Sequence, residues 1–142
     1  MRTYSLTTER NSSKTLHIML WIAQVLLAAM FLMAGFMKLT QPIDTLSQSL
    51  SWAAQVPEAL VRFIGLAELL GAIGLVLPSL SRIKPKLTAW AAIGIAIIML
   101  LATLFHISRG ETAVIGMNIF IALLAGFISW GRFNKAAIPA KA

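Results

Sequence analysis

The sequence predicts an all-α protein, a four-transmembrane-helix bundle with its N and C termini cytoplasmic. Of its 142 residues, 58% are hydrophobic and the mean hydropathy is +0.83, whereas a soluble domain is about 45–50% apolar. Four apolar runs are long enough to cross a hydrocarbon layer of roughly 30 Å as helices. The Lys and Arg residues gather in alternate segments between these runs.

The four spans are predicted at about residues 17–37, 59–77, 87–107 and 113–131. In lipid the backbone must satisfy its own hydrogen bonds, and a barrel would need shorter segments of alternating polarity, so we expect helices. The chain then divides into a polar N-terminal segment (1–16), a membrane domain (17–133) and a tail (134–142). The first run exceeds a signal peptide's apolar core of about 7–15 residues, so we expect it to be retained.

The positive charges set the predicted orientation. Nine of the twelve Lys and Arg residues flank the termini and the link between spans two and three: Arg2, Arg10, Lys14, Arg82, Lys84, Lys86, Arg132, Lys135 and Lys141. The positive-inside rule places these segments in the cytoplasm, and we expect the protein in the cytoplasmic (inner) membrane. Because the charges flank spans and do not line one groove, we expect a lipid bilayer and no nucleic acid as partner.

The first outer link is the only long one. Between Pro42 and Pro57, apolar residues recur at helical spacing at Ile43, Leu46, Leu50 and Ala54. This pattern favours a short amphipathic helix over residues 43–54 on the outer surface, and a solvated loop is the alternative.

Each span carries one stripe of small or polar residues, and we expect the four stripes to face one another because small residues allow close helix approach in lipid. The stripes are Gln24, Leu27, Phe31, Ala34 and Lys38; Gly65, Glu68, Gly71 and Ala72; Ala92, Ala96, Met99, Thr103 and His106; and Asn118, Ala122, Ala125 and Ser129.

Glu68 has the highest predicted cost of insertion. It lies roughly 13 Å below the outer surface, where an ionised carboxylate costs about 2.5–3.5 kcal/mol. We therefore predict a polar pocket, open to the outer face, formed by Lys38, Glu68, His106, Asn118 and Arg62. Each member also has a structural interpretation: an ion pair for the acid, snorkelling for the two cations, an interfacial ring for His106 and interhelical hydrogen bonding for Asn118.

Several classes of chemistry lack support in the sequence. The chain has no Cys, so it has no thiol chemistry of its own. It carries no nucleotide-binding, nucleophile-elbow or metalloprotease motif, and one intramembrane His with one carboxylate falls short of a metal site. We expect no metal, no evident cofactor and no independent catalytic activity.

Four segments resemble the DoxX-like family: GFMKL at 35–39, RFIGLAELLGAIGLVLP at 62–78, FHISRGE at 105–111 and NIFIALLAGFISWGRF at 118–133. The resemblance extends over residues 18–133. It implies a four-helix bacterial membrane bundle associated with respiratory or redox systems, because the family name comes from a subunit of a thiosulfate:quinone oxidoreductase. It picks out Lys38, Glu68 and His106 as motif positions, and thiosulfate oxidation would be analogy at the level of the fold alone.

These observations leave three functions open. The first is an accessory or ligand-binding subunit whose pocket takes a small ligand, with a quinone as the candidate cofactor and redox-complex subunits or a homo-oligomer as candidate partners. The second is a small proton-coupled transporter or permeation path that uses Glu68 and His106 as a relay. The third is a purely structural membrane scaffold.

Overall fold

The computed structural model describes the backbone of residues 2–142 and the side chains of residues 13–142. Within that range it is helical and contains no strand. The long helices are α1 (Arg2–Thr40), α3 (Glu58–Ser81), α4 (Lys86–Ser108) and α5 (Ile115–Trp130). The short ones are α2 (Ile43–Ser49), the 3-10 turns η1 (Ser51–Ala54) and η2 (Thr112–Val114), and the π-helical turn η3 (Gly131–Lys135).

Four segments of the described chain are long and apolar enough to cross a membrane: Ser13–Thr40, Glu58–Ser81, Lys86–Ser108 and Thr112–Lys135. Large apolar side chains such as Leu66, Leu101 and Leu123 are exposed on their outer faces. Such a surface is stable against lipid tails and would aggregate in water. The four-span bundle is therefore confirmed, and its orientation relative to the cytoplasm stays a prediction.

The buried positions recur every three or four residues along each span. On α3 they are Val61, Gly65, Glu68, Ala72, Leu75 and Ser79. This spacing is the heptad pattern that keeps one seam of a helix facing its neighbours in a bundle. The predicted stripes are confirmed, because every residue in them is buried or half-buried.

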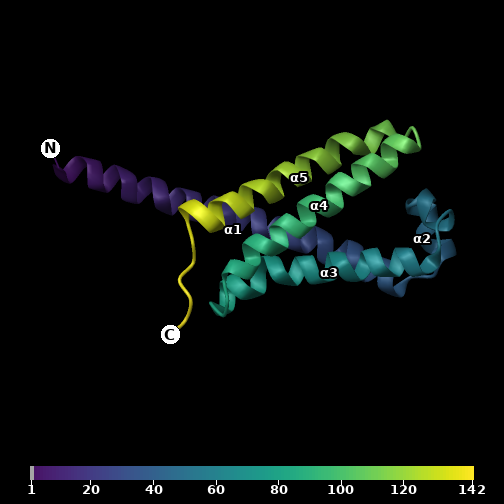
Figure 1. Cartoon of the computed structure of the whole chain (residues 1–142), viewed down its shortest axis with the longest axis horizontal. Coiled ribbons are helices and arrows are strands. Elements are labelled where there is room, and N and C mark those ends of the chain that lie inside the picture. Colours follow the sequence, from purple (N-terminus) through teal and green to yellow (C-terminus); the bar gives the residue numbers. More distant parts are fainter. Residues whose placement is uncertain (1) are drawn as a thin grey trace.

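The helices form two closely packed pairs, α1 with α3 and α4 with α5, joined mainly through α3 and α4. We call the end of the bundle with the termini and the α3–α4 link the terminal end, and the end with α2, η1 and η2 the distal end; the two pairs diverge toward the distal end (Figure 1). One core draws on all four long helices, for example Leu27, Leu75, Ile95 and Ile128. A second core, around Leu46, Ala53 and Val61, contains no residue of α4 or α5.

The segment after α1 is helical only in part. Its helix α2 ends at Ser49, Leu50 adopts an extended conformation (φ −122°, ψ 80°), and η1 follows. Leu46 is buried as expected, but Ala53 is buried and Ala54 is exposed. The prediction of one helix with Ala54 on its apolar side is wrong, because the break at Leu50 resets the register of the following turn.

At the terminal end the C-terminal tail lies against the link between α3 and α4. The Lys141 backbone N–H donates to the Arg82 carbonyl (2.8 Å), and the Arg82 Nε donates to the Pro139 carbonyl (3.0 Å). Two residues of the link, Arg82 (φ 60°) and Lys84 (φ 47°), have left-handed backbones. The tail therefore covers a turn whose conformation is uncommon for residues with side chains.

Two glycines permit the closest contact between α1 and α3. A Cβ added to Gly35 would lie 2.7 Å from the Gly65 carbonyl oxygen and 2.8 Å from the Leu69 backbone nitrogen. A Cβ added to Gly65 would lie 2.7 Å from the Lys38 Cβ. Backbone atoms cannot rotate out of the way, so only glycine fits at position 35.

We expect Gly35→Ala to destabilise the bundle by about 1–3 kcal/mol, the usual cost of overpacking a tight contact. Gly126→Ala is the matched control, because a Cβ at Gly126 meets nothing within 4 Å. Its higher helix propensity should leave stability unchanged or slightly raised. The free energy of unfolding in mixed micelles measures both, and equal effects of the two substitutions would contradict the close contact.

Candidate functional site: a buried ion pair between α1 and α3

A buried ion pair joins α1 to α3 inside the membrane-spanning part of the bundle. The Lys38 Nζ lies 2.7 Å from Oε2 and 3.0 Å from Oε1 of Glu68. The two residues are only 7% and 5% exposed. An amine placed between both oxygens of a carboxylate in a low-dielectric setting forms a strong charge-assisted contact.

The direction of the two helices explains why these side chains meet. In an α-helix each Cα–Cβ bond leans toward the N-terminus of its own helix. Lys38 is in the last turn of α1 and leans back into the bundle, whereas Glu68 is in the middle of the antiparallel helix α3 and leans toward the distal end. The two side chains therefore extend toward each other along the bundle.

The glycine contact lies directly beside the ion pair. Glycine at position 65 leaves room for the Lys38 stem, and the position where Gly35 would carry a Cβ is 3.3 Å from the Glu68 Cβ. The two helix backbones must approach this closely for the charges to be buried together. Packing and electrostatics at this point therefore depend on the same residues.

Arg62 binds next to the ion pair without joining it. Its Nη1 donates to the backbone carbonyls of Lys38 (2.5 Å) and Gln41 (2.8 Å), and its Nη2 forms a salt bridge with Glu58 (2.8 Å). The last carbonyls of a helix have no partner within the helix. Arg62 supplies donors to that end of α1 and so fixes the turn that leads to α2.

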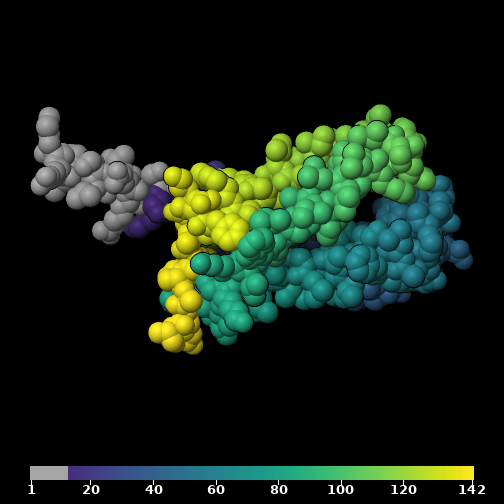
Figure 2. Space-filling model, in the orientation of Figure 1, coloured from purple at the N-terminus to yellow at the C-terminus, as the bar shows by residue number. Residues whose placement is uncertain are grey.

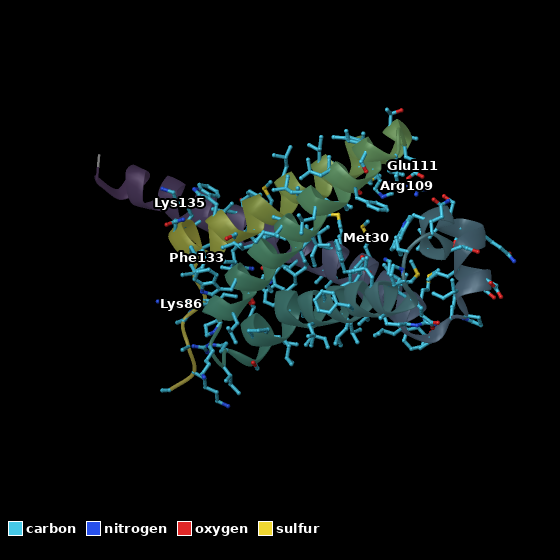
Figure 3. The ribbon with its side chains drawn as sticks, turned by 45° about the vertical axis from the view of Figure 1, so that its right-hand side comes forward. Met30, Lys86, Arg109, Glu111, Phe133 and Lys135 are labelled. Atoms are coloured by element: carbon cyan, nitrogen blue, oxygen red, sulfur yellow. The ribbon has the colours of Figure 1, made fainter. Side chains whose placement is uncertain are left out.

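A second polar cluster, which we call the distal clasp, consists of Gln55, His106, Arg109 and Glu111. Glu111 contacts the His106 Nδ1 (2.6 Å) and the Arg109 Nη2 (2.7 Å). Arg109 also donates to the Gln55 Oε1 (2.5 Å). The clasp therefore connects η1 to the α4–α5 turn, where Figure 3 shows Arg109 and Glu111 facing the α2–η1 side.

Aromatic contacts support the distal clasp. The Trp52 and Phe105 rings meet edge to face at 5.9 Å, and the Arg109 guanidinium lies 5.4 Å from the centre of the Phe105 ring. Edge-to-face pairs and cation–π contacts each add on the order of 0.5–1 kcal/mol. These contacts hold the two helix pairs together where they share no buried core.

The structure brings together part of the predicted site. Lys38, Glu68 and Arg62 are neighbours, whereas His106 bonds to Glu111, and in the described chain no hydrogen bond links it to Glu68 or Lys38. Asn118 is half-buried, and its Nδ2 is a buried donor with no partner. Among the described residues no three His, Cys, Asp or Glu side chains gather in one place. A ligand-binding role for the five predicted residues stays a prediction.

Sequence reasoning missed a polar cluster at the terminal end. The Arg132 Nε donates to the Gln24 Oε1 (2.5 Å), and the Gln24 Nε2 donates to the Leu75 carbonyl (2.6 Å). Arg132 was counted only as a flanking charge. Its spacing from Ala125 and Ser129 continues the small-residue stripe of α5 by one further turn, and that signal could have placed it inside the bundle.

Removing one member of the ion pair leaves the other buried without a counter-charge. We expect Glu68→Gln or Lys38→Met to lower the free energy of unfolding by about 3–5 kcal/mol, the usual cost of breaking a buried pair. The double variant Lys38→Met/Glu68→Leu should recover most of that loss. A double-mutant cycle in mixed micelles measures the coupling, and strictly additive losses would show that the two charges are independent.

The distal clasp should weaken in acid. Hydrogen bonds from Arg109 and His106 lower the pKa of the Glu111 carboxyl from its usual 4.5. A group whose pKa is lower in the folded state stabilises the fold above the unfolded value and loses that contribution as pH falls through the lowered value. We expect the clasp to hold above about pH 4.5 and to open progressively below it.

Hydrogen exchange of the η1 amides as a function of pH measures this opening. Glu111→Gln should exchange faster at neutral pH and lose the acid transition, whereas Asp44→Asn, at an exposed position of α2, should keep it. An unchanged pH profile in Glu111→Gln would show that this carboxyl does not hold the clasp.

Comparison with known proteins shows the family of this chain. No curated protein and no solved structure matches the chain. The model of the DoxX-like family matches residues 22–128, which include the ion pair, the whole of the second and third spans and most of the first and fourth. A multi-pass membrane protein with this match over most of its length belongs to the DoxX-like family.

Proposed function

We propose that the protein is a noncatalytic, ligand-binding membrane subunit that holds a small lipid-soluble molecule with a polar head, of the quinone class, in the distal half of the bundle. The observation that carries this proposal is the Lys38–Glu68 pair, which is almost fully buried in the span region. Ionisable groups at such depth are expensive to insert, and they mark functional positions more often than structural ones.

A buried hydrogen-bond donor without a partner also supports a ligand in the distal half of the bundle. The Asn118 Nδ2 is buried without a partner in the described chain, and a buried amide without a hydrogen bond costs about 1–3 kcal/mol. It belongs to α5, on the opposite helix pair from the ion pair. A ligand carbonyl between the two pairs would satisfy this donor.

The distal end has a core of its own on one helix pair. This core contains no residue of α4 or α5, and the two helix pairs diverge toward that end (Figure 1). A ligand held between two apolar helix pairs with few polar groups would need a flat apolar body and carbonyl oxygens as acceptors. A quinone has this shape and this chemistry.

A proton path has less support. The relay considered above requires Glu68 and His106 to exchange a proton, but His106 bonds to Glu111 in the distal clasp. A separate enzymatic activity also lacks a nucleophile with an activating base. Binding therefore fits the side chains better than transport or catalysis.

The experiment measures quinone per mole of protein extracted with its own lipids. We expect wild type to retain quinone above a lipid blank, and Asn118→Leu to reduce retention by roughly fivefold, the loss of one hydrogen bond. Asn134→Leu is the matched control, because Asn134 is exposed at the terminal end. The same measurement on Glu68→Gln tests whether quinone retention depends on the ion pair. Glu58→Gln, at an exposed position, is its control.

Equal quinone content in wild type, Asn118→Leu and the lipid blank would overturn the proposal. If Glu68→Gln then lowered only stability, the pair would be a structural latch and the protein a scaffold. Because Asn118→Leu removes an unpaired donor and should not lower stability, it separates ligand loss from misfolding.

A further inference from the structure

A basic groove of about 400 Å³ lies at the terminal end, between the first turns of the first span and the C-terminal π-helical turn. It is lined by Ser13, Lys14, His17, Ile18, Lys135, Ala136 and Ala137. Figure 2 shows the C-terminal segment, in yellow, lying against the first described residues of α1, in purple. The groove is therefore bounded by residues far apart in the sequence.

The groove lies at the ends of two membrane-spanning segments. One wall is at the start of the span Ser13–Thr40, and the opposite wall is at the end of the span Thr112–Lys135. Residues at the ends of membrane spans contact the headgroup region. A headgroup is thus the nearest abundant ligand.

Among the residues whose side chains are described, the groove carries positive charge without a matching acid. Lys14 and Lys135 are both exposed, and neither has an ion-pair partner among the residues whose side chains are described. Of the five Asp and Glu residues of the chain, Asp44, Glu58, Glu68 and Glu111 lie away from the groove, in the link after α1, in α3 and next to η2. The fifth, Glu9, is outside the described side chains. No described acid therefore neutralises the two lysines.

Arg132 adds a buried charge directly behind the wall of the groove. It is 4% exposed, and its Nη1 lies 3.1 Å from the His17 Nδ1 and donates to the Ala136 carbonyl (3.0 Å). His17 and Ala136 both line the groove. The Arg132 Nη2 is buried with no partner in the described chain.

This cluster has more hydrogen-bond donors than acceptors. The Trp21 indole N–H points at the His17 Nε2 (3.1 Å), while the Arg132 guanidinium points at the Nδ1 of the same ring. Indole and guanidinium only donate, and a neutral imidazole can accept at one nitrogen only. One of the two donors, the Trp21 indole or the Arg132 guanidinium, therefore faces an N–H of the His17 ring. An added acceptor beside His17 would give that donor a partner.

We propose that this groove binds the phosphate of an anionic phospholipid headgroup. A phosphodiester anion offers only acceptors and matches a donor-rich, positively charged site. Lys14 and Lys135 supply the positive charge, Ser13 and His17 line the same groove, and Arg132 positions His17 from behind. Basic pockets between membrane helices bind anionic headgroups by this chemistry. The proposal is independent of quinone binding, because it uses the opposite end of the bundle.

Native mass spectrometry of the detergent-solubilised full chain, titrated with phosphatidylglycerol or phosphatidylcholine, tests the proposal. We expect wild type to prefer phosphatidylglycerol, and Lys14→Gln/Lys135→Gln to weaken its binding by roughly thirty-fold, from the loss of two lysines at the lipid surface. The control Lys84→Gln/Lys86→Gln removes the same charge from the same end, outside the groove, and should bind like wild type. Both pairs are exposed, so neither change should affect folding.

Three results would overturn the proposal. Equal binding of the two lipids would exclude recognition of an anionic headgroup. Equal losses in the two double variants would assign the effect to net charge and not to the groove. Full displacement of phosphatidylglycerol by inorganic phosphate, with the same dependence on Lys14 and Lys135, would reassign the groove to a soluble anion.

Discussion

The contact between Gly35 and Gly65 is the constraint on which the rest of the structure depends. Helices surrounded by lipid gain no hydrophobic free energy from association, so they rely on close packing and on polar contacts between them. The missing Cβ atoms let α1 and α3 approach until a Gly65 carbonyl would contact any added atom at position 35. At that separation Lys38 can reach Glu68, and Arg62 can reach the last carbonyls of α1.

The charged side chains are paired differently at the two ends of the bundle. Toward the distal end three of the acids have a basic partner: Glu58 has Arg62, Glu68 has Lys38 and Glu111 has Arg109. At the terminal end the buried guanidinium of Arg132 donates to neutral acceptors, and the residues whose side chains are described offer it no acid. The chain has a formal net charge of +7, which anions from outside the chain must balance. The unpaired positive charge is concentrated at the terminal end.

Sequence reasoning predicted the elements and the buried faces well, because apolar run length and three- or four-residue spacing depend only on local order along the chain. It also identified Glu68 and Lys38 by their depth. It failed where the position of a side chain depends on a contact from another segment or on an irregular turn. The position of His106 depends on the nearby Glu111 more than on Glu68. The break at Leu50 shifts burial to Ala53, and the π-helical turn carries Arg132 into the bundle.

The pairing of Lys38 with Glu68 has a consequence for how the chain enters the membrane. The lysine is synthesised first and ends its span, so its long stem can hold the amine in the headgroup region until a partner arrives. Glu68 lies in the middle of its span, and its short side chain cannot reach the headgroup region. Lateral release of α3 into lipid is therefore most favourable once α1 is already beside it. We therefore expect the first two spans to enter the lipid together as one hairpin, with the glycine contact already formed.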